Sequence, residues 1–465
     1  MALQRRPLHY LTALGLLLAM PLLTNCSRQT LESTQTVSKV NDTLVIWWEQ
    51  GYHHQEDEAI QSAVETWQQE TGHQVELLLI GQDVMIKKIE NALKLGTPPD
   101  IFYFNRGAET TILPWARDGL LADVSEVVEP LKDIYSSEAL KSSSLFNRTT
   151  QKYSTYAVPL NQRSVHVHYS KPLLEKAGLS KADIPTEWDA FWTFWQQAQD
   201  TLRDQGDAVT YGLGLTMSSE SHDTYSTFEQ ILEAYDIQLF DENGNLQLQD
   251  PQIQNEIVTA LDWYTSFYKT GYVPPSASDW LNRDNNTAFL NQELLMVVNP
   301  TLSIPVSQRE DEDIYNNQIA TIELPDEPDG ETARYRASMQ QMVVFESAVN
   351  KEMAKDFLIF LMQPENIAPY VEGTSGRFFP VMQQLMSDPF WTDSSDPHIS
   401  IAIQQFEGRK NVLNGHHLNP AYGVVQSENV WGYAIDSIVT DNVSPEAAAA
   451  HAIHRIEEIF ADWKR

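Results

Sequence analysis

From residue 43 onward the sequence alternates between short apolar runs and longer amphipathic segments. The runs TLVIWW (43–48), QVELLLI (74–80) and IFYF (101–104) have the length and composition of buried strands. The segments 54–72 and 83–96 between them carry apolar residues at helical spacing and end at glycine. Strands that alternate with helices in this way form parallel sheets, because a right-handed crossover connects each strand to the next. The alternation therefore predicts an α/β fold.

The ends of the first and third predicted strands carry aromatic and polar side chains. The first ends in WWEQG (47–51) and the third in FNRG (104–107). Ligands of parallel sheets bind beyond the carboxyl ends of the strands, so we expect both ends to face one crevice. Successive strand residues point to opposite faces, and only one of Trp47 and Trp48 is therefore expected to face that crevice.

The first 25 residues have the pattern of a secretory signal. Two arginines precede the apolar run 11–23, which is too short for an ordinary transmembrane helix. Cys26 follows this run and is the only cysteine of the chain, so it cannot form an internal disulfide. We predict a signal peptide at 1–25 and a polar, flexible tether at 26–42.

Length and charge narrow the function classes. A chain of 465 residues with 42% hydrophobic residues can bury a large core, which favours two domains or lobes. The formal net charge of −33 repels phosphate backbones, so nucleic-acid binding is excluded. We find no nucleophile elbow, P-loop or zincin motif in the sequence.

Seven stretches carry a further pattern and together span nearly all of the chain after residue 42. They are TLVIWWEQG (43–51), LGTPPDIFYF (95–104), DGLLADVSE (118–126), YAVPLNQRSVHVHYSK (156–171), TAFLNQELLMVVNP (287–300), NKEMAKDFLIFL (350–361) and ENVWGYAIDSIVTDNVSPEAAAA (428–450). In this order they resemble the family 1 extracellular solute-binding proteins of ABC importers, the family that includes maltose-binding protein.

The segment around Cys26 carries a second resemblance. Leu23-Thr24-Asn25-Cys26 is similar to the bacterial lipobox, in which the cysteine is lipidated and becomes the first residue of the mature protein. Asn25 departs from the small residue that the pattern prefers before the cysteine. A plain signal peptide with an incidental cysteine is the alternative.

The family resemblance implies a specific α/β architecture. It is a two-lobed, periplasmic-binding-protein-like fold with a multi-strand hinge and a ligand cleft between the lobes. Mapped onto this chain, the crossings fall near 159–161, 297–299 and 338–341, which gives a first lobe of 43–160 plus 298–338 and a second lobe of 161–297 plus 339–465.

The same resemblance suggests which residues line the cleft. Aromatic rings pack on the apolar faces of sugars, while carboxylates, amides and arginines bond to their hydroxyl groups. Side chains of these types occur where the family places its ligand contacts. The candidates are Trp48, Glu49, Asp83, Asn105, Arg106, Asn161, Gln162, Tyr225, Trp280, Arg377 and Trp431.

Structural roles compete with ligand binding at several candidates. Asp83 has the position of a helix N-cap, and Arg106 is suited to a surface ion pair. Asn161 and Gln162 have amides that can satisfy the backbone of a hinge. Trp431 is of the size and type that packs between helices.

Histidines occur in pairs in three places in the sequence. They are His53 with His54, His166 with His168, and His416 with His417. The spacing of His166 and His168 puts both on one strand face, which is compatible with metal, but no cysteine or carboxylate accompanies them. We predict solvated or hydrogen-bonded histidines, with no metal and no cofactor.

Together these features predict a monomeric receptor, lipid-anchored on the extracytoplasmic face of a bacterial membrane, periplasmic or at the cell surface. It would capture a small neutral sugar or polyol by hinge closure and deliver it to an ABC permease, without catalysis. A glycoside hydrolase is one alternative, because an acidic aromatic cleft suits that chemistry. A sensory or adhesion ectodomain is the other.

Overall fold

The computed structural model describes residues 43–106, 111–241, 244–406, 411–413, 415 and 419–463. The predicted signal peptide 1–25, Cys26 and the tether 26–42 lie outside them. All elements named below belong to the unit Asn41–Arg465. Within the described ranges, no helix combines the length and apolarity that crossing a bilayer requires.

The larger sheet begins with the three strands that the sequence predicts. β1 (Thr43–Glu49) pairs in parallel with both β2 (Gln74–Ile80) and β3 (Ile101–Phe104). α1 (His54–Thr71) and α2 (Gln82–Leu95) connect them, and each ends at a glycine with positive φ. The predicted parallel α/β arrangement is confirmed.

Antiparallel strands from later in the chain extend this sheet. The strand order is β12-β6-β11-β3-β1-β2, and β13 pairs with β11 outside this path. These strands are β6 (Val158–Arg163), β11 (Tyr335–Val344), β12 (Phe379–Pro380) and β13 (Asn411–Leu413). β11 therefore lies between β3 and β6, although more than 170 residues separate it from β6 in sequence.

A second sheet has the order β10-β7-β9-β8, and a hairpin of β4 and β5 stands apart from both. The bounds of these strands are β4 (Ser144–Asn147), β5 (Lys152–Thr155), β7 (His166–Ser170), β8 (Tyr211–Gly214), β9 (Leu294–Asn299) and β10 (Ile319–Ile322). All five residues of β7 and all six of β9 are buried, as expected for central strands of a covered sheet.

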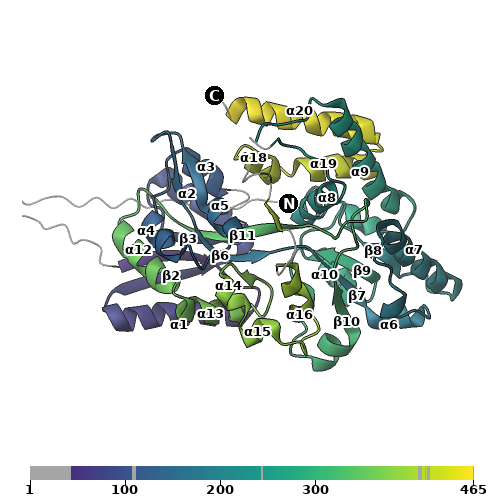
Figure 1. The fold of residues 1–465 in the computed structure, drawn as a ribbon, viewed down its shortest axis with the longest axis horizontal. Coiled ribbons are helices and arrows are strands. Elements are labelled where there is room, and N and C mark those ends of the chain that lie inside the picture. The colour runs from purple at the N-terminus through teal and green to yellow at the C-terminus, as the bar shows by residue number, and fades with distance from the viewer. Residues whose placement is uncertain are drawn as a thin grey trace, which may run out of the picture. The chain divides into compact units, whose positions relative to one another are not determined.

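The remaining helices cover the two sheets (Figure 1). They are α3 (Leu113–Arg117), α4 (Ser125–Val128), α5 (Ser137–Ser143), α6 (Lys171–Lys176), α7 (Trp188–Asp204), α8 (His222–Ala234), α9 (Pro251–Lys269), α10 (Asp284–Leu290), α11 (Ser303–Val306), α12 (Lys351–Leu361), α13 (Pro364–Gly373), α14 (Gln383–Met386), α15 (Pro389–Thr392), α16 (Ile399–Ala402), α18 (Tyr422–Ser427), α19 (Val430–Thr440) and α20 (Pro445–Trp463). Short 3-10 or π turns complete the order at Glu129–Leu131, Lys181–Asp183, Pro275–Ser278, Ile314–Gln318 and Ile403–Gln405.

Two hydrophobic clusters define two lobes. The first lobe packs buried side chains from 44–160 and 337–406 around the larger sheet. The second lobe packs side chains from 165–298, 319–335 and 421–460 around the smaller sheet. α11 contributes to both, because Val306 belongs to the first cluster and Ile304 to the second.

This packing differs from the predicted lobe boundaries at two segments. Residues 319–335 pack in the second lobe because β10 pairs with β7 of the smaller sheet. Residues 339–406 pack in the first lobe because β11 inserts between β3 and β6. The predicted boundaries switched lobes at each crossing, and the sequence holds no signal for which strands later pair.

Candidate functional site

A cavity of about 550 Å³ lies between the two lobes. Its volume is in the range of small-molecule sites. Both lobes supply polar side chains to it. The lining residues are Glu49, Gln50, Gly51, Tyr52, Gly81, Gln82, Asn105, Arg106 and Arg377, with Arg163, Glu220, His222, Asp223, Leu281, Asn282, Arg283, Asp284, Asn286, Asn299, Pro300, Thr301 and Ser303.

The carboxyl ends of β1 and β3 form the first-lobe wall. The two strands are parallel neighbours, so Glu49 and Asn105 come together where the strands end. Glu49 accepts hydrogen bonds from the Asn105 backbone N–H at 2.8 Å and from its Nδ2 at 2.7 Å. Burial raises the pKa of Glu49, although Arg377 and the Asn105 amide oppose this shift.

The side-chain oxygen of Asn105 is a buried hydrogen-bond acceptor that a ligand could satisfy. Asn105 is 6% exposed, and its Oδ1 has no hydrogen-bond partner among the described residues. An unpaired buried acceptor costs free energy, so this oxygen favours a ligand that brings a donor.

Arg377 lines the cavity beside the start of α1. Its Nη1 lies 3.0 and 2.9 Å from the two carboxylate oxygens of Glu56, which is buried. Its guanidinium also stacks on Phe378, at 4.4 Å from the ring centre. Gly51 allows Glu56 to pack against the backbone at this point, because a Cβ on residue 51 would lie 2.5 Å from the Cβ of Glu56.

The second-lobe wall includes a buried carboxyl group at the start of α8. Asp223 is 8% exposed and accepts a hydrogen bond from Asn285 Nδ2 at 3.2 Å. Burial raises the pKa of Asp223 to about 6, although Arg163, Asn285 and Arg106 act in the opposite direction. The pKa of Asp223 therefore lies much closer to neutral pH than that of an ordinary aspartate.

Replacing Asp223 by asparagine should reveal this titration as a change in stability. Because the folded-state pKa is raised from 3.8 to about 6, the carboxyl group lowers stability above pH 6 and has no such effect below about pH 4. The free energy of unfolding of D223N minus that of wild type should therefore be about 3 kcal/mol larger at high pH than at low pH, which means that the variant gains stability relative to wild type as the pH rises. Urea unfolding of both proteins, well above pH 6 and well below about pH 4, measures this. An equal difference in stability between D223N and wild type under both conditions would contradict the prediction.

Amide and hydroxyl groups form the floor of the cavity. Asn299 Nδ2 donates to Asn286 Oδ1 at 2.6 Å, and Asn286 Nδ2 donates to Ser303 Oγ at 3.1 Å. Asn299 Oδ1 accepts from the Thr301 N–H at 3.0 Å. These bonds fix the orientation of the amides before any ligand arrives.

Charges in the cavity lining balance. The described lining carries the carboxyl groups of Glu49, Glu220, Asp223 and Asp284 and the guanidinium groups of Arg106, Arg163, Arg283 and Arg377. Neither sign dominates, in contrast to the acidic chain as a whole. The cavity can therefore present both donors and acceptors to an uncharged ligand.

The structure brings four of the sequence-predicted residues together in this lining. They are Glu49, Asn105, Arg106 and Arg377. The side chain of Asp83 lies outside the described part of the structure, and its neighbour Gln82 lines the cavity. Trp48, Asn161, Gln162, Tyr225, Trp280 and Trp431 are not among the lining residues.

Both tryptophans predicted to grip the ligand lie in hydrophobic cores. Trp48 is 1% exposed, its ring centre is 4.3 Å from that of Tyr103, and its Nε1 donates to the Tyr370 hydroxyl at 3.2 Å. Trp431 is fully buried in the second lobe, where its Nε1 donates to the Tyr422 hydroxyl at 2.8 Å. Each indole N–H thus already donates to a protein hydroxyl group.

The other predicted residues away from the lining are also buried among protein groups. Asn161 and Gln162 lie on β6, and Gln162 Nε2 donates to the Pro380 carbonyl at 2.7 Å. Tyr225 stacks on His222 at 5.3 Å between ring centres, and borders a smaller cavity of about 30 Å³. Trp280 packs in the second-lobe cluster.

Sequence reasoning missed several lining residues of the second lobe. His222 and Asp223 begin the same helix from which Tyr225 was chosen, and Arg283 lies three residues after Trp280. The correct segments were found, but the aromatic residue was chosen in each. The signal that could have identified His222, Asp223 and Arg283 is their position as polar residues at or just before the start of a helix.

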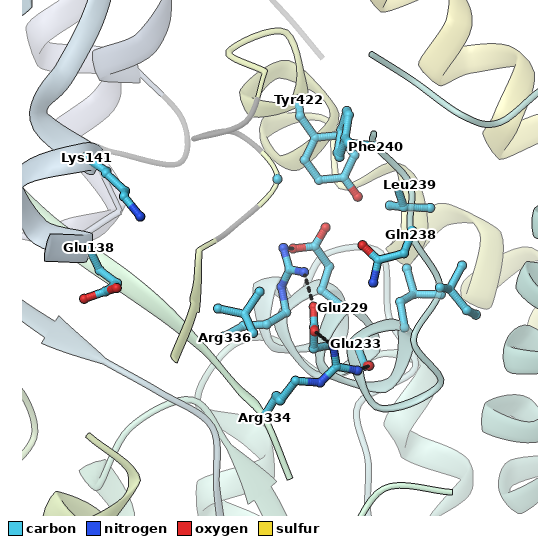
Figure 2. Close-up of a pocket in the computed structure, with 14 residues that line it drawn as sticks. Glu138, Lys141, Glu229, Glu233, Gln238, Leu239, Phe240, Arg334, Arg336 and Tyr422 are labelled. Carbon is cyan, nitrogen blue, oxygen red and sulfur yellow. Dashed lines mark hydrogen bonds and ion pairs between the residues drawn. The ribbon is translucent and has the colours of Figure 1, made fainter. Parts of the chain in front are cut away.

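A second cavity, of about 350 Å³, adjoins the hinge strand β11 (Figure 2). Arg336 lies 3.2 Å from Glu233 and 3.3 Å from Glu229, and Arg334 lies 3.0 Å from both Glu233 and Glu327. These carboxylates already neutralise the two arginines. The cavity contains none of the predicted site residues.

The paired histidines of β7 are buried and have no metal-like arrangement. The His168 and His398 rings each contact the Thr321 hydroxyl through Nδ1, at 2.9 and 2.6 Å. Burial lowers the pKa of His166 to about 3 and that of His398 to about 4. The described residues contain no group of three or more potential ligands placed to hold a metal ion. His416 and His417 lie outside them.

Sequence relatives include putative binding proteins of bacteria. A putative binding protein of Brucella abortus is 21% identical over 318 residues, which cover 68% of this chain and 70% of that protein. A putative ABC transporter periplasmic-binding protein of Escherichia coli is 24% identical over 249 residues, which cover 53% of this chain and 52% of that protein.

Solved structures of sugar-binding proteins share the fold. A solute-binding protein from Thermotoga lettingae, bound with α-D-tagatose, has a TM-score of 0.72 at 20% identity and covers 90% of this chain and 99% of its own. A maltose-bound protein from Thermotoga maritima has a TM-score of 0.70 at 16% identity, with the same coverage. At these identities the likeness shows the two-lobed fold alone.

The family itself is shown by a sequence match. The model of the bacterial extracellular solute-binding proteins matches residues 51–368, which is more than half of the chain. The matched region contains most of the residues that line the cavity, including the start of α8 and the end of β3. The chain therefore belongs to the bacterial extracellular solute-binding protein family.

Proposed function

We propose that this protein captures a small uncharged carbohydrate or polyol between its lobes and delivers it to an ABC permease without changing it chemically. The observation that carries the proposal is the cavity between the lobes, which both walls line with polar and charged side chains and in which Asn105 Oδ1 has no hydrogen-bond partner among the described residues. A polyol supplies such donors and acceptors around its whole rim.

The balance of charges in the lining supports an uncharged ligand. A solute with a net charge would meet an equal number of groups of its own sign. Among the described lining residues the one phenol ring is that of Tyr52, and two guanidinium groups contact it. Recognition would therefore depend on hydrogen bonds to hydroxyl groups more than on stacking.

Structural relatives support the same ligand class. Proteins with this fold are described with bound tagatose, maltose or laminaribiose, the last in a protein of Arthrobacter chlorophenolicus with a TM-score of 0.69 at 14% identity. We extend this chemistry to the present chain because its cavity is polar, balanced in charge and of fitting size.

Delivery would follow from closure of the lobes. A ligand that contacts both walls stabilises the closed form, because in the open form it contacts only one. We further propose that lipidation of Cys26 anchors the monomeric receptor at the extracytoplasmic face of the membrane. Metabolic labelling with a radioactive fatty acid tests this, and label retained by Cys26→Ser would contradict it.

A thermal-shift screen of sugars and polyols tests the proposed ligand class. A ligand present at 100 times its dissociation constant stabilises the native state by about 2.7 kcal/mol, which gives a clear rise in melting temperature. A full panel of neutral sugars without any shift would contradict the proposal. Release of reducing ends from oligosaccharides would instead indicate a hydrolase.

Replacing Asn105 by alanine should weaken binding of the sugar found in that screen. The variant removes the free acceptor Oδ1 and the donor that holds Glu49 in place. We expect a loss of about 1–3 kcal/mol in binding free energy, measured by calorimetry. Asn366→Ala is the matched control, because Asn366 is in the same lobe, does not line the cavity, and uses its side-chain Nδ2 to donate to the Phe360 carbonyl. Equal affinities for N105A and N366A would remove Asn105 from the site.

A further inference from the structure

We infer that Arg283 and Tyr52 form a clasp across the cavity, which stabilises the closed arrangement of the lobes without any ligand. Arg283 belongs to the second lobe and Tyr52 to the first, and both line the cavity. The Arg283 guanidinium lies 4.9 Å from the centre of the Tyr52 ring. Arg283 is thus a positioning residue for closure, and the inference rests on the proposed hinge motion but not on the identity of the ligand.

The first lobe holds the ring of Tyr52 in place. Arg377 lies 5.3 Å from the ring centre, and its own position is fixed by Glu56 and by Phe378. The His53 ring packs edge-on against Tyr52 at 4.8 Å. All of these groups belong to the first lobe, so they are expected to keep Tyr52 oriented in the open form as well.

The second lobe holds the backbone of Arg283. Arg283 immediately precedes α10, and the Asp284 carboxylate accepts a hydrogen bond from the Leu281 N–H at 2.8 Å, which closes the turn that presents Arg283. Arg283 is the one guanidinium of the second lobe that contacts a described ring of the first lobe in this cavity. Because this contact joins the two lobes, we expect it to break when they separate.

Electrostatics allow two guanidinium groups at one ring. The carboxylate of Glu56 neutralises Arg377, which lowers its repulsion of Arg283. The negative face of the phenol ring attracts a cation, and this attraction is short-ranged. At an exposed residue such as Arg283, a contact of this kind shifts an open–closed equilibrium by about two- to fivefold.

The clasp can be tested by measuring the distance between the lobes in the ligand-free protein. Spin labels at Lys94→Cys on α2 and Asn255→Cys on α9 report this distance, since both positions are exposed and lie in different lobes. The full chain carries Cys26→Ser so that only these sites react. We expect R283A and Y52L each to raise the open-to-closed ratio about two- to fivefold, and Y52F to leave it unchanged because the ring remains.

Three further comparisons make the outcome decisive. The double variant R283A/Y52L should match either single variant, because both remove one contact. Arg203→Ala is the matched control, since Arg203 lies 5.5 Å from the Tyr211 ring within the second lobe. An unchanged ratio in R283A or in Y52L, additive effects in the double variant, or an equal shift in R203A would overturn the clasp. A failed sugar screen would not affect this measurement.

Discussion

Replacing Trp431 by alanine is expected to lower the free energy of unfolding by about 3–5 kcal/mol. The indole is fully buried in the second-lobe cluster, lies 5.7 Å from the Phe228 ring and donates to the Tyr422 hydroxyl. Its removal leaves a large void and deletes the buried hydrogen bond to the Tyr422 hydroxyl. Urea unfolding measures the loss, and calorimetry on the folded protein should show a ligand affinity that changes little.

Tyr433→Ala is the matched control for this prediction. Tyr433 is an aromatic residue of the same helix, α19, but is 59% exposed. A surface substitution of this kind changes stability by no more than about 0.5 kcal/mol. If Trp431→Ala abolished sugar binding while the stability stayed at the level of Tyr433→Ala, the tryptophan would belong to the binding site and not to the core.

Replacing Arg377 by leucine is expected to lower the free energy of unfolding by about 3–5 kcal/mol, because it leaves a buried carboxylate without its partner. Glu56 is 4% exposed, and both of its carboxylate oxygens bond to Arg377. Burial already raises the pKa of Glu56, and Arg377 is the first group that opposes this shift. Urea unfolding at neutral pH measures the loss.

Two properties identify Glu56 as the cause of that loss. The deficit of R377L should shrink as the pH falls. Burial raises the pKa of Glu56 in the folded state, so the carboxylate takes up a proton as the pH falls and then has no charge to bury. The double variant E56L/R377L should recover part of the stability, since neither charge remains. A deficit that is independent of pH and persists in the double variant would point to lost packing on Phe378 instead.

Much of the first-lobe wall was predictable from sequence. Glu49 and Asn105 follow apolar runs of strand length, and parallel neighbours end at the same sheet edge. The fold class followed from the same alternation, and the family resemblance agreed with it. These inferences rest on local patterns, which a single sequence carries in full.

The aromatic residues show where the structure differs from the sequence prediction, because Trp48 and Trp431 do not line the cavity. Trp48 and Trp431 are large and apolar, and such side chains suit both a sugar face and a hydrophobic core. Only the positions of Tyr103, Tyr370, Phe228 and Tyr422 decide between these roles, and three of these four residues are distant in sequence from the tryptophan they contact. The site is accordingly more polar than predicted.

The sequence by itself determined the first three strands and two helices of the first lobe and the polar groups at the ends of β1 and β3, because hydrophobic periodicity and helix termini are local properties. The family followed from the resemblance of seven stretches to known solute-binding proteins. Only the tertiary structure decided which lobe received residues 319–335 and 339–406, and which side chains face the cavity. Those choices depend on strand pairing between segments that are distant in sequence. Successive residues of a strand also point to opposite faces of the sheet, which places Trp48 in the core and its neighbour Glu49 at the cavity.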